Sequence, residues 1–123
     1  MPSILIVTNK KDDFSVFAAA LKKHGDIDLS WAESGSKALD TASGQAFDLM
    51  VTDEELGDMT GLELALKLLS VNPMINSASV SSLSTEDFHE AGEGLGLMMQ
   101  LSSPPGRDEA GELIERLRKI MGL

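Results

Sequence analysis

The stretch FDLMVTDEELGDMTGLEL, residues 47 to 64, decides the fold of this 123-residue chain. Its apolar run Leu49 to Val51 predicts a short buried strand, and Asp53 follows that strand almost directly. An acidic loop containing Gly57 comes next, and a helix is expected to begin near Gly61. Open α/β sheets carry their functional groups at the carboxyl ends of their strands. Asp53 is therefore the first candidate functional residue.

Apolar runs and helical periodicities alternate on both sides of this stretch. The expected strands span residues 3–8, 27–31, 49–51, 75–81 and 97–101, and the expected helices run over about 13–24, 34–44, 61–71, 85–94 and 108–121. In the third helix we expect Leu62, Leu66 and Leu69 to face the core, and in the last one Ile120 among others. Glycines 92, 94 and 96 predict that the fourth helix is short or mobile. The alternation predicts a single α/β domain over residues 1–123 with a parallel, doubly wound sheet.

Composition excludes several classes of function. The chain has 20 acidic and 10 basic residues, and its net charge of -10 opposes contact with nucleic acid or an anionic membrane. The same charge favours a basic protein partner or divalent cations. No apolar run approaches the roughly 18 to 20 residues that a membrane span needs. The absence of cysteine fits a reducing, cytoplasmic setting.

The order and spacing of these elements resemble the receiver domain of two-component response regulators, over essentially the whole chain. The matching pieces are Ile4-Leu5-Ile6-Val7, Ala32-Glu33-Ser34-Gly35-Ser36-Lys37-Ala38-Leu39, Phe47-Asp48-Leu49-Met50-Val51 with Asp53, Gly61-Leu62-Glu63-Leu64, and Ser103-Pro104. The resemblance implies a three-layer αβα domain with a five-stranded parallel sheet in the order 2-1-3-4-5. It also implies that the chain is a signalling module and not an enzyme.

Two positions agree with the phosphorylation site of that family. Asp53 matches the aspartate that accepts a phosphoryl group from a kinase histidine, and a carboxylate is a workable nucleophile for forming an acyl phosphate. Ser81 matches the hydroxyl residue after the fourth strand, which binds the phosphoryl oxygen and moves in the switch. The resemblance therefore implies phosphoacceptor and switch roles for these residues.

Other positions depart from the family. Thr8 and Asn9 stand where the family has the two acidic residues that hold Mg²⁺, and Ser103 stands where it has a lysine. Gln100 occupies the position of the aromatic switch residue of the fifth strand. These replacements predict a degenerate receiver, because phosphoryl transfer depends mainly on metal and cationic groups.

Substitutes for the missing groups are available nearby in the sequence. If Mg²⁺ binds, Asp53, Asn9 and Glu55 are the candidate ligands, whereas Asp12 and Asp13 are better explained as caps and first-turn charges of the first helix. Lys10 or Lys11 could reach Asp53 in place of the lysine. We favour solvated loop charges as the interpretation of Glu55 and of both lysines. No resident cofactor is expected beyond a weakly held Mg²⁺.

Two functions within this family remain open. The favoured one is a pseudo-receiver of a phosphorelay pathway that acts through protein–protein interaction with its phosphorylation lost or weakened. The alternative is a working response regulator phosphorylated at Asp53 by a histidine kinase. A flavodoxin-like cofactor binder is disfavoured, because the loop from Thr8 to Asp12 has no glycine. The expected partners are a histidine kinase, an output domain or another signalling protein, with residues 86–123 as the surface for partners or for a homodimer.

Overall fold

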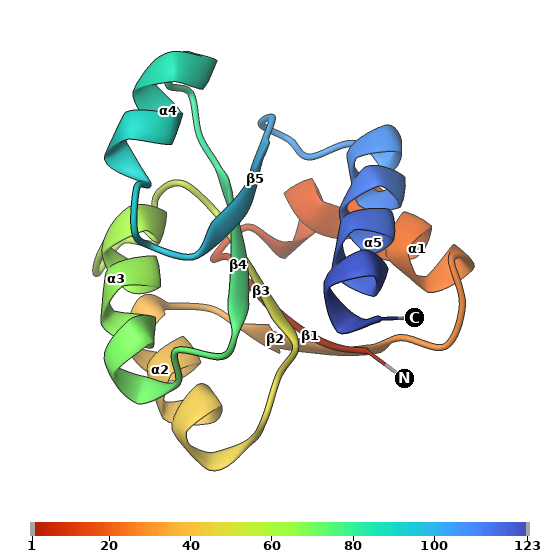
Figure 1. Ribbon diagram of the computed structural model, residues 1–123, viewed down its shortest axis with the longest axis horizontal. Helices are drawn as coiled ribbons and strands as arrows, with labels where there is room; N and C mark the ends of the chain where they lie inside the picture. Colours follow the sequence, from red (N-terminus) through yellow and green to blue (C-terminus); the bar gives the residue numbers. More distant parts are fainter. Residues whose placement is uncertain (1, 123) are drawn as a thin grey trace.

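A five-stranded parallel sheet lies between helices in the computed structural model, which describes residues 2–122 (Figure 1). The strands are β1 (Ser3–Val7), β2 (Asp28–Ala32), β3 (Leu49–Thr52), β4 (Asn76–Val80) and β5 (Leu97–Leu101). The helices are a 3-10 turn (Lys11–Phe14), α1 (Ser15–Lys23), α2 (Gly35–Gly44), α3 (Gly61–Val71), α4 (Thr85–Ala91) and α5 (Arg107–Met121). The strand order β2-β1-β3-β4-β5 confirms the predicted fold and topology.

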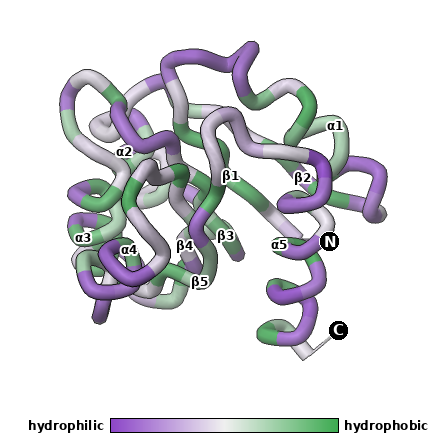
Figure 2. Tube along the Cα trace, turned by 90° about the horizontal axis from the view of Figure 1, so that it is seen from above, coloured by the Kyte–Doolittle hydropathy of each residue, from purple (hydrophilic) through white to green (hydrophobic). Residues whose placement is uncertain are grey.

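Helices α1 and α5 cover one face of the sheet, α2 and α3 cover the other, and α4 stands beyond the end of α3 (Figure 1). Strand β1 sends alternate side chains into the two cores that result. Ile4 and Ile6 belong to the core beneath α1 and α5, whereas Leu5 and Val7 belong to the core beneath α2 and α3. Figure 2 shows the same arrangement as apolar central strands inside a more polar outer layer. None of the helices in the described part of the chain combines the length and apolar character that crossing a membrane requires.

Helix α3 begins at the predicted residue, and two local features define that start. Thr60 and Glu63 form a capping box: the Glu63 N–H donates to Thr60 Oγ1 (3.1 Å), and the Thr60 N–H donates to Glu63 Oε1 (3.3 Å). Gly61 then brings the helix close to the ends of β3 and β4. A Cβ atom at this position would clash with the Asp53 carbonyl oxygen and lie 2.8 Å from Ser79 Oγ. Glycine is thus required for the close approach of α3 to the sheet.

The predicted inward face of α3 was wrong. Leu64 and Leu68 are the leucines buried against the sheet, whereas Leu66 is 57% exposed and Leu62 and Leu69 are only half-buried. This helix has leucines on two faces, so periodicity alone does not choose between them. The close approach of the helix to the strand ends at Gly61 turns Leu64 and Leu68 toward the sheet.

In the second half of the chain one expectation is confirmed and one is wrong. Helix α4 ends at Ala91 and is therefore short, as its glycines suggested, because a turn through Gly94 and Gly96 with positive φ follows it. Ile120 of α5 does not face the core as expected and is 57% exposed. It lies in the last turn of that helix, where the neighbouring Met121 is the side chain that packs against the core.

We expect Gly61→Ala to lower the free energy of unfolding by roughly 1–3 kcal/mol, since the added methyl group overpacks a junction of backbone atoms. Urea denaturation checks this prediction. Gly44→Ala is the matched control, because a Cβ at Gly44 meets no atom within 4 Å and alanine favours the helix. Equal stability of both variants and the wild type would show that α3 can shift away from the sheet at little cost.

Candidate functional site at the carboxyl edge of the sheet

Asp53 lies one residue past the end of β3, half-buried, with donors on both carboxylate oxygens. The Thr8 hydroxyl donates to Oδ2 (2.8 Å), and the Glu54 N–H donates to Oδ1 (2.8 Å). The Asp53 N–H donates to the carbonyl oxygen of Val7 (2.9 Å), which extends the pairing of β3 with β1. The carboxylate is therefore held by neutral donors on the chain itself.

Thr8 is buried, 4% exposed, directly after β1. Its hydroxyl donates to Asp53 and accepts a hydrogen bond from the Lys10 N–H (2.9 Å). The resemblance places Thr8 at a position where the family has an acidic residue. In the structure it acts as a hydrogen-bond donor to Asp53 in place of a second carboxylate.

The two lysines considered as substitute cations do not pair with Asp53. Lys11 Nζ lies 4.6 Å from the centroid of the Trp31 ring, a cation–π contact on the β2 side of the loop. Within residues 2–122 the ion pairs are Lys37–Glu33 and Arg116–Glu112, so neither Lys10 nor any other cation lies within ion-pair distance of Asp53.

The position that the family gives to lysine is exposed here. Ser103 lies in the loop between β5 and α5, and a carboxylate organises that loop. Glu109 accepts hydrogen bonds from the Ser102 N–H (2.9 Å), the Ser102 hydroxyl (2.8 Å) and the Gly106 N–H (2.9 Å). The loop that supplies a positive charge in the family is thus bound in this chain by an acidic residue from the first turn of α5.

The candidate metal ligands lie around one loop. Asn9 and Glu55 are both exposed and lie beside Gly57. A Cβ at Gly57 would lie 3.7 Å from Asn9 Nδ2. The Gly57 N–H donates to Glu55 Oε1 (3.4 Å). Asp53 already accepts two hydrogen bonds. The described residues contain no group of three or more His, Cys, Asp or Glu placed to hold a metal ion. Mg²⁺ keeps several waters and binds through one or two carboxylates, so weak binding at Asp53, Asn9 and Glu55 stays a prediction.

Asp12 and Asp13 lie in the 3-10 turn before α1 and are exposed. The expectation that they carry first-turn charge is met, because both are in the first turn of the 3-10 segment. The expectation that one of them caps the helix was wrong: the residue at the N-cap of α1 is Phe14, and no side-chain hydrogen bond caps it.

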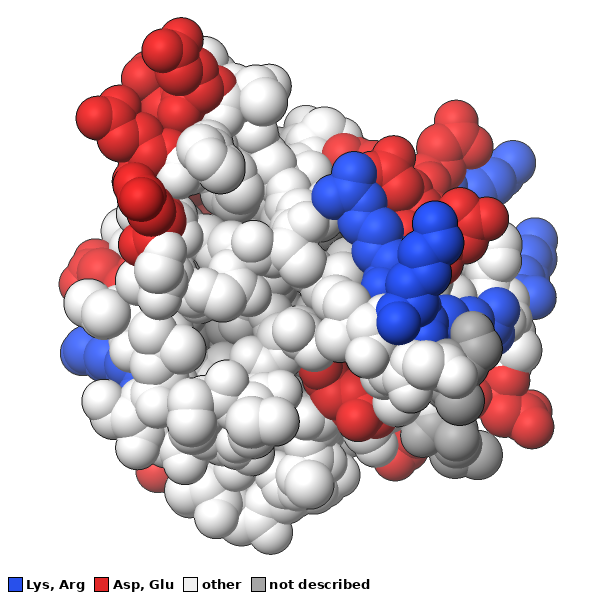
Figure 3. Space-filling view, in the orientation of Figure 1, with Lys and Arg blue, Asp and Glu red and all other residues white. Residues whose placement is uncertain are grey.

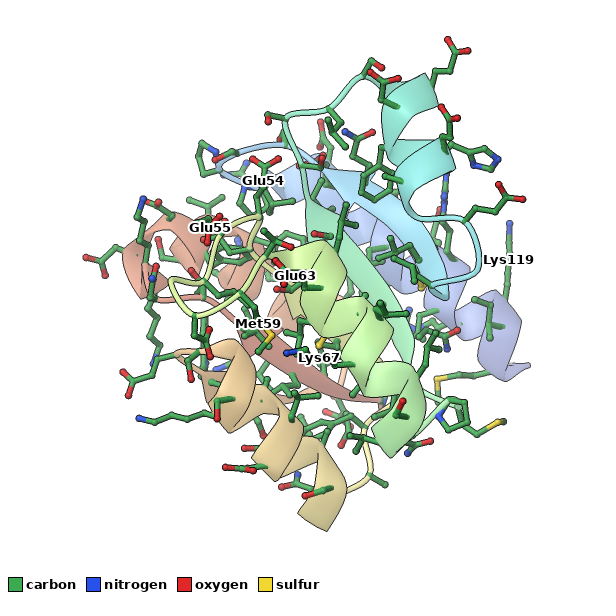
Figure 4. All side chains as sticks on the ribbon, turned by 90° about the vertical axis from the view of Figure 1, so that its left-hand side faces the viewer. Glu54, Glu55, Met59, Glu63, Lys67 and Lys119 are labelled. Atoms are coloured by element: carbon green, nitrogen blue, oxygen red, sulfur yellow. The ribbon has the colours of Figure 1, made fainter. Side chains whose placement is uncertain are left out.

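Glu54 joins the Asp53 loop to the loop that follows β4. Its Oε2 atom accepts hydrogen bonds from both the N–H (2.7 Å) and the hydroxyl (2.9 Å) of Ser82. Figure 4 shows Glu54 and Glu55 together on the loop above the start of α3. The two neighbouring carboxylates differ in role, because Glu54 binds a second loop and Glu55 binds only its own.

Asp58, in the same loop, caps the start of α2. Its Oδ1 accepts from the Gly35 N–H (3.0 Å) and its Oδ2 from the Ser36 N–H (2.9 Å). These two backbone hydrogen bonds lower the pKa of the Asp58 carboxyl below its ordinary value. Met59 lies beside them, between α2 and α3 (Figure 4), and its side chain occupies the space that a Cβ at position 35 would enter.

Ser81 lies at the end of β4, 8% exposed, beside the strand that carries Asp53. Its hydroxyl accepts a hydrogen bond from the Leu83 N–H (3.2 Å). Gln100, at the position of the aromatic switch residue, donates through Nε2 to the carbonyl oxygens of Ser81 (3.2 Å) and Leu83 (2.7 Å). A polar side chain thus binds the loop that begins at Ser81.

The family follows from comparison with known proteins. Residues 4–116 match the model of the response regulator receiver domain. The chain is 31% identical over 104 residues to a response regulator receiver protein of Anaeromyxobacter sp. (strain Fw109-5), covering 85% of this chain and 43% of that protein. The chain therefore belongs to the response regulator receiver domain family, and it spans less than half the length of this relative.

Solved structures agree on the fold. A two-component response regulator from Clostridium difficile superimposes with a TM-score of 0.84 at 18% identity, over 100% of both chains. The chemotaxis response regulator CheY4 of Vibrio cholerae gives 0.80 at 19% identity, over 95% of this chain and 98% of that one. At such low identity these likenesses concern the fold alone.

The sequence did not reveal the bonds that Glu54, Asp58 and Gln100 make. Each joins residues 17 to 28 positions apart, and no local motif marks such a pair. The hydrogen bond from Thr8 to Asp53 had an indirect signal. Both residues stand at the carboxyl ends of predicted strands that are neighbours in the sheet, and these ends lie at the same edge.

We expect Asp58→Asn to destabilise the domain in a pH-dependent way. Because the folded-state pKa of Asp58 is lowered, the ionised carboxylate stabilises the fold above the unfolded-state pKa, about 3.9, and this stabilisation is lost as the pH falls through the folded-state pKa. The unfolding free energies of wild type and variant should differ most above about pH 5 and converge in more acidic solution. A difference that stays constant from neutral to strongly acidic pH would contradict this role.

Proposed function

We propose that this domain is a signal-transduction receiver that acts through protein–protein contacts, with Mg²⁺-dependent phosphorylation of Asp53 lost or weakened. The observation that carries the proposal is the environment of Asp53. Its carboxylate oxygens bind the Thr8 hydroxyl and the Glu54 N–H, and within the described chain no cation pairs with it. We assign the domain no catalytic activity of its own.

Electrostatics supports this proposal. A phosphoryl group on Asp53 would replace the single negative charge of its carboxylate with nearly two at neutral pH, in a loop that already holds Glu54, Glu55 and Asp58. The transition state of phosphoryl transfer needs positive charge from metal or side chains. With Thr8 and Asn9 at the acid-pair positions and Ser103 at the lysine position, little of that charge is available.

The partner surface in this proposal comprises α4, β5 and α5. A groove of about 680 Å³ runs along it, lined by Phe88, Met98, Met99 and Gln100 among others, with Glu109 and Arg116 at its α5 side. We propose that a histidine kinase, an output domain or a second copy of the chain binds here. The net charge of -10 makes nucleic acid and anionic membranes poor partners, and the cysteine-free composition supports a cytoplasmic setting.

A working phosphoacceptor is the second candidate. It is favoured by the position of Asp53 and Ser81 at the ends of neighbouring strands β3 and β4, with Asp53 half-exposed to solvent. In that case a kinase partner would have to supply the missing charge stabilisation.

Beryllofluoride with Mg²⁺, monitored by amide chemical shifts, tests the proposal. Wild type should show little or no change near Asp53. The triple variant Thr8→Asp, Asn9→Asp, Ser103→Lys restores the acid pair and the lysine, and it should respond at lower Mg²⁺ concentration. Asp53→Ala in the triple variant is the matched control and should abolish the response. A strong wild-type response that Asp53→Ala removes would favour the second candidate instead.

A further inference from the structure

Helix α4 is held to the domain by few contacts. It has seven residues, all described, and Phe88 is the one that is buried. Figure 1 shows the helix standing away from the sheet, and Figure 3 shows acidic side chains gathered over it. Its exposed acids are Glu86, Asp87 and Glu90. The loop after it contains Gly94 and Gly96 at positive φ. The position of α4 therefore depends strongly on the loop at its amino end.

That loop, Ser81 to Leu83, is bound by side chains from two neighbouring parts of the domain. Glu54, from the loop after β3, accepts the N–H and hydroxyl of Ser82 at 2.7 and 2.9 Å. Gln100, from β5, donates to the carbonyl oxygens of Leu83 and Ser81 at 2.7 and 3.2 Å. Glu54 therefore accepts hydrogen bonds from donors of the loop, and Gln100 donates hydrogen bonds to carbonyl oxygens of the loop. Both kinds of backbone group are thus satisfied.

We propose that Glu54 and Gln100 form a polar clasp that sets the position of α4 and thereby the shape of the groove between α4, β5 and α5. Gln100 itself lines that groove beside Phe88 and Met99, so a change at the clasp alters the groove directly. The clasp is an intramolecular control of α4 that needs no phosphoryl group. Only its effect on a partner rests on the proposed function.

The charge of Glu54 makes the clasp responsive to its surroundings. A basic partner side chain that pairs with Glu54 would compete with Ser82 for its oxygens. Such a contact opens the clasp, because the hydrogen bonds to Ser82 lie at the exposed surface.

Hydrogen exchange of the backbone amides of residues 84–96 tests the clasp. Glu54→Ala and Gln100→Leu should each raise exchange there about tenfold, the factor expected from the net loss of one or two exposed hydrogen bonds. Glu54→Gln keeps an acceptor oxygen and should give an intermediate rate. Glu55→Ala is the matched control, since Glu55 bonds only within its own loop, and it should leave these amides unchanged.

Amides of β1 and β3 report on global stability in the same samples and should not change. The proposal is overturned if Glu54→Ala and Gln100→Leu leave residues 84–96 at the wild-type rate. It is equally overturned if exchange rises by the same factor throughout the sheet, which would indicate general destabilisation. No phosphodonor enters this experiment, so its outcome is independent of the phosphorylation test.

Discussion

Three carboxylates of the loop between β3 and α3 accept hydrogen bonds from three other parts of the domain, and the carboxyl edge of the sheet depends on them. Asp53 binds the residue after β1, Glu54 binds the loop after β4, and Asp58 binds the start of α2. Each carboxylate is stabilised by N–H or O–H donors, which satisfy it without a partner cation. One loop therefore positions three elements that are distant in sequence.

The same hydrogen bonds define what the site does chemically. The threonine hydroxyl orients the carboxylate of Asp53, but it brings no positive charge for an incoming phosphoryl group. Thr8 thus orients Asp53 at a position where the family has a carboxylate. Glu109, which organises the loop around Ser103, adds to the acidic character of this edge. These features are the basis of the proposal that the domain acts in recognition.

The fold was largely predictable because its signals are local. Apolar strands, a Thr60–Glu63 capping box and glycines after helices mark where elements begin and end within a few residues of sequence. The orientation of α3 was not predictable, since its leucines form more than one apolar face and both satisfy the helical period. Leu66 is exposed because the close approach at Gly61 turns Leu64 and Leu68 toward the sheet.

For the site, the sequence by itself determined which residues stand at the ends of the strands: Thr8, Asp53 and Ser81, with Ser103 in place of a cation. Their strand-end positions follow from short-range patterns and from the order of a parallel sheet. Only the tertiary structure decided that Glu54 binds Ser82 and that Gln100 binds the Ser81–Leu83 loop. A charged side chain on a loop can pair with any donor within its reach, and that reach depends on how separate segments pack, which no local pattern in the sequence records.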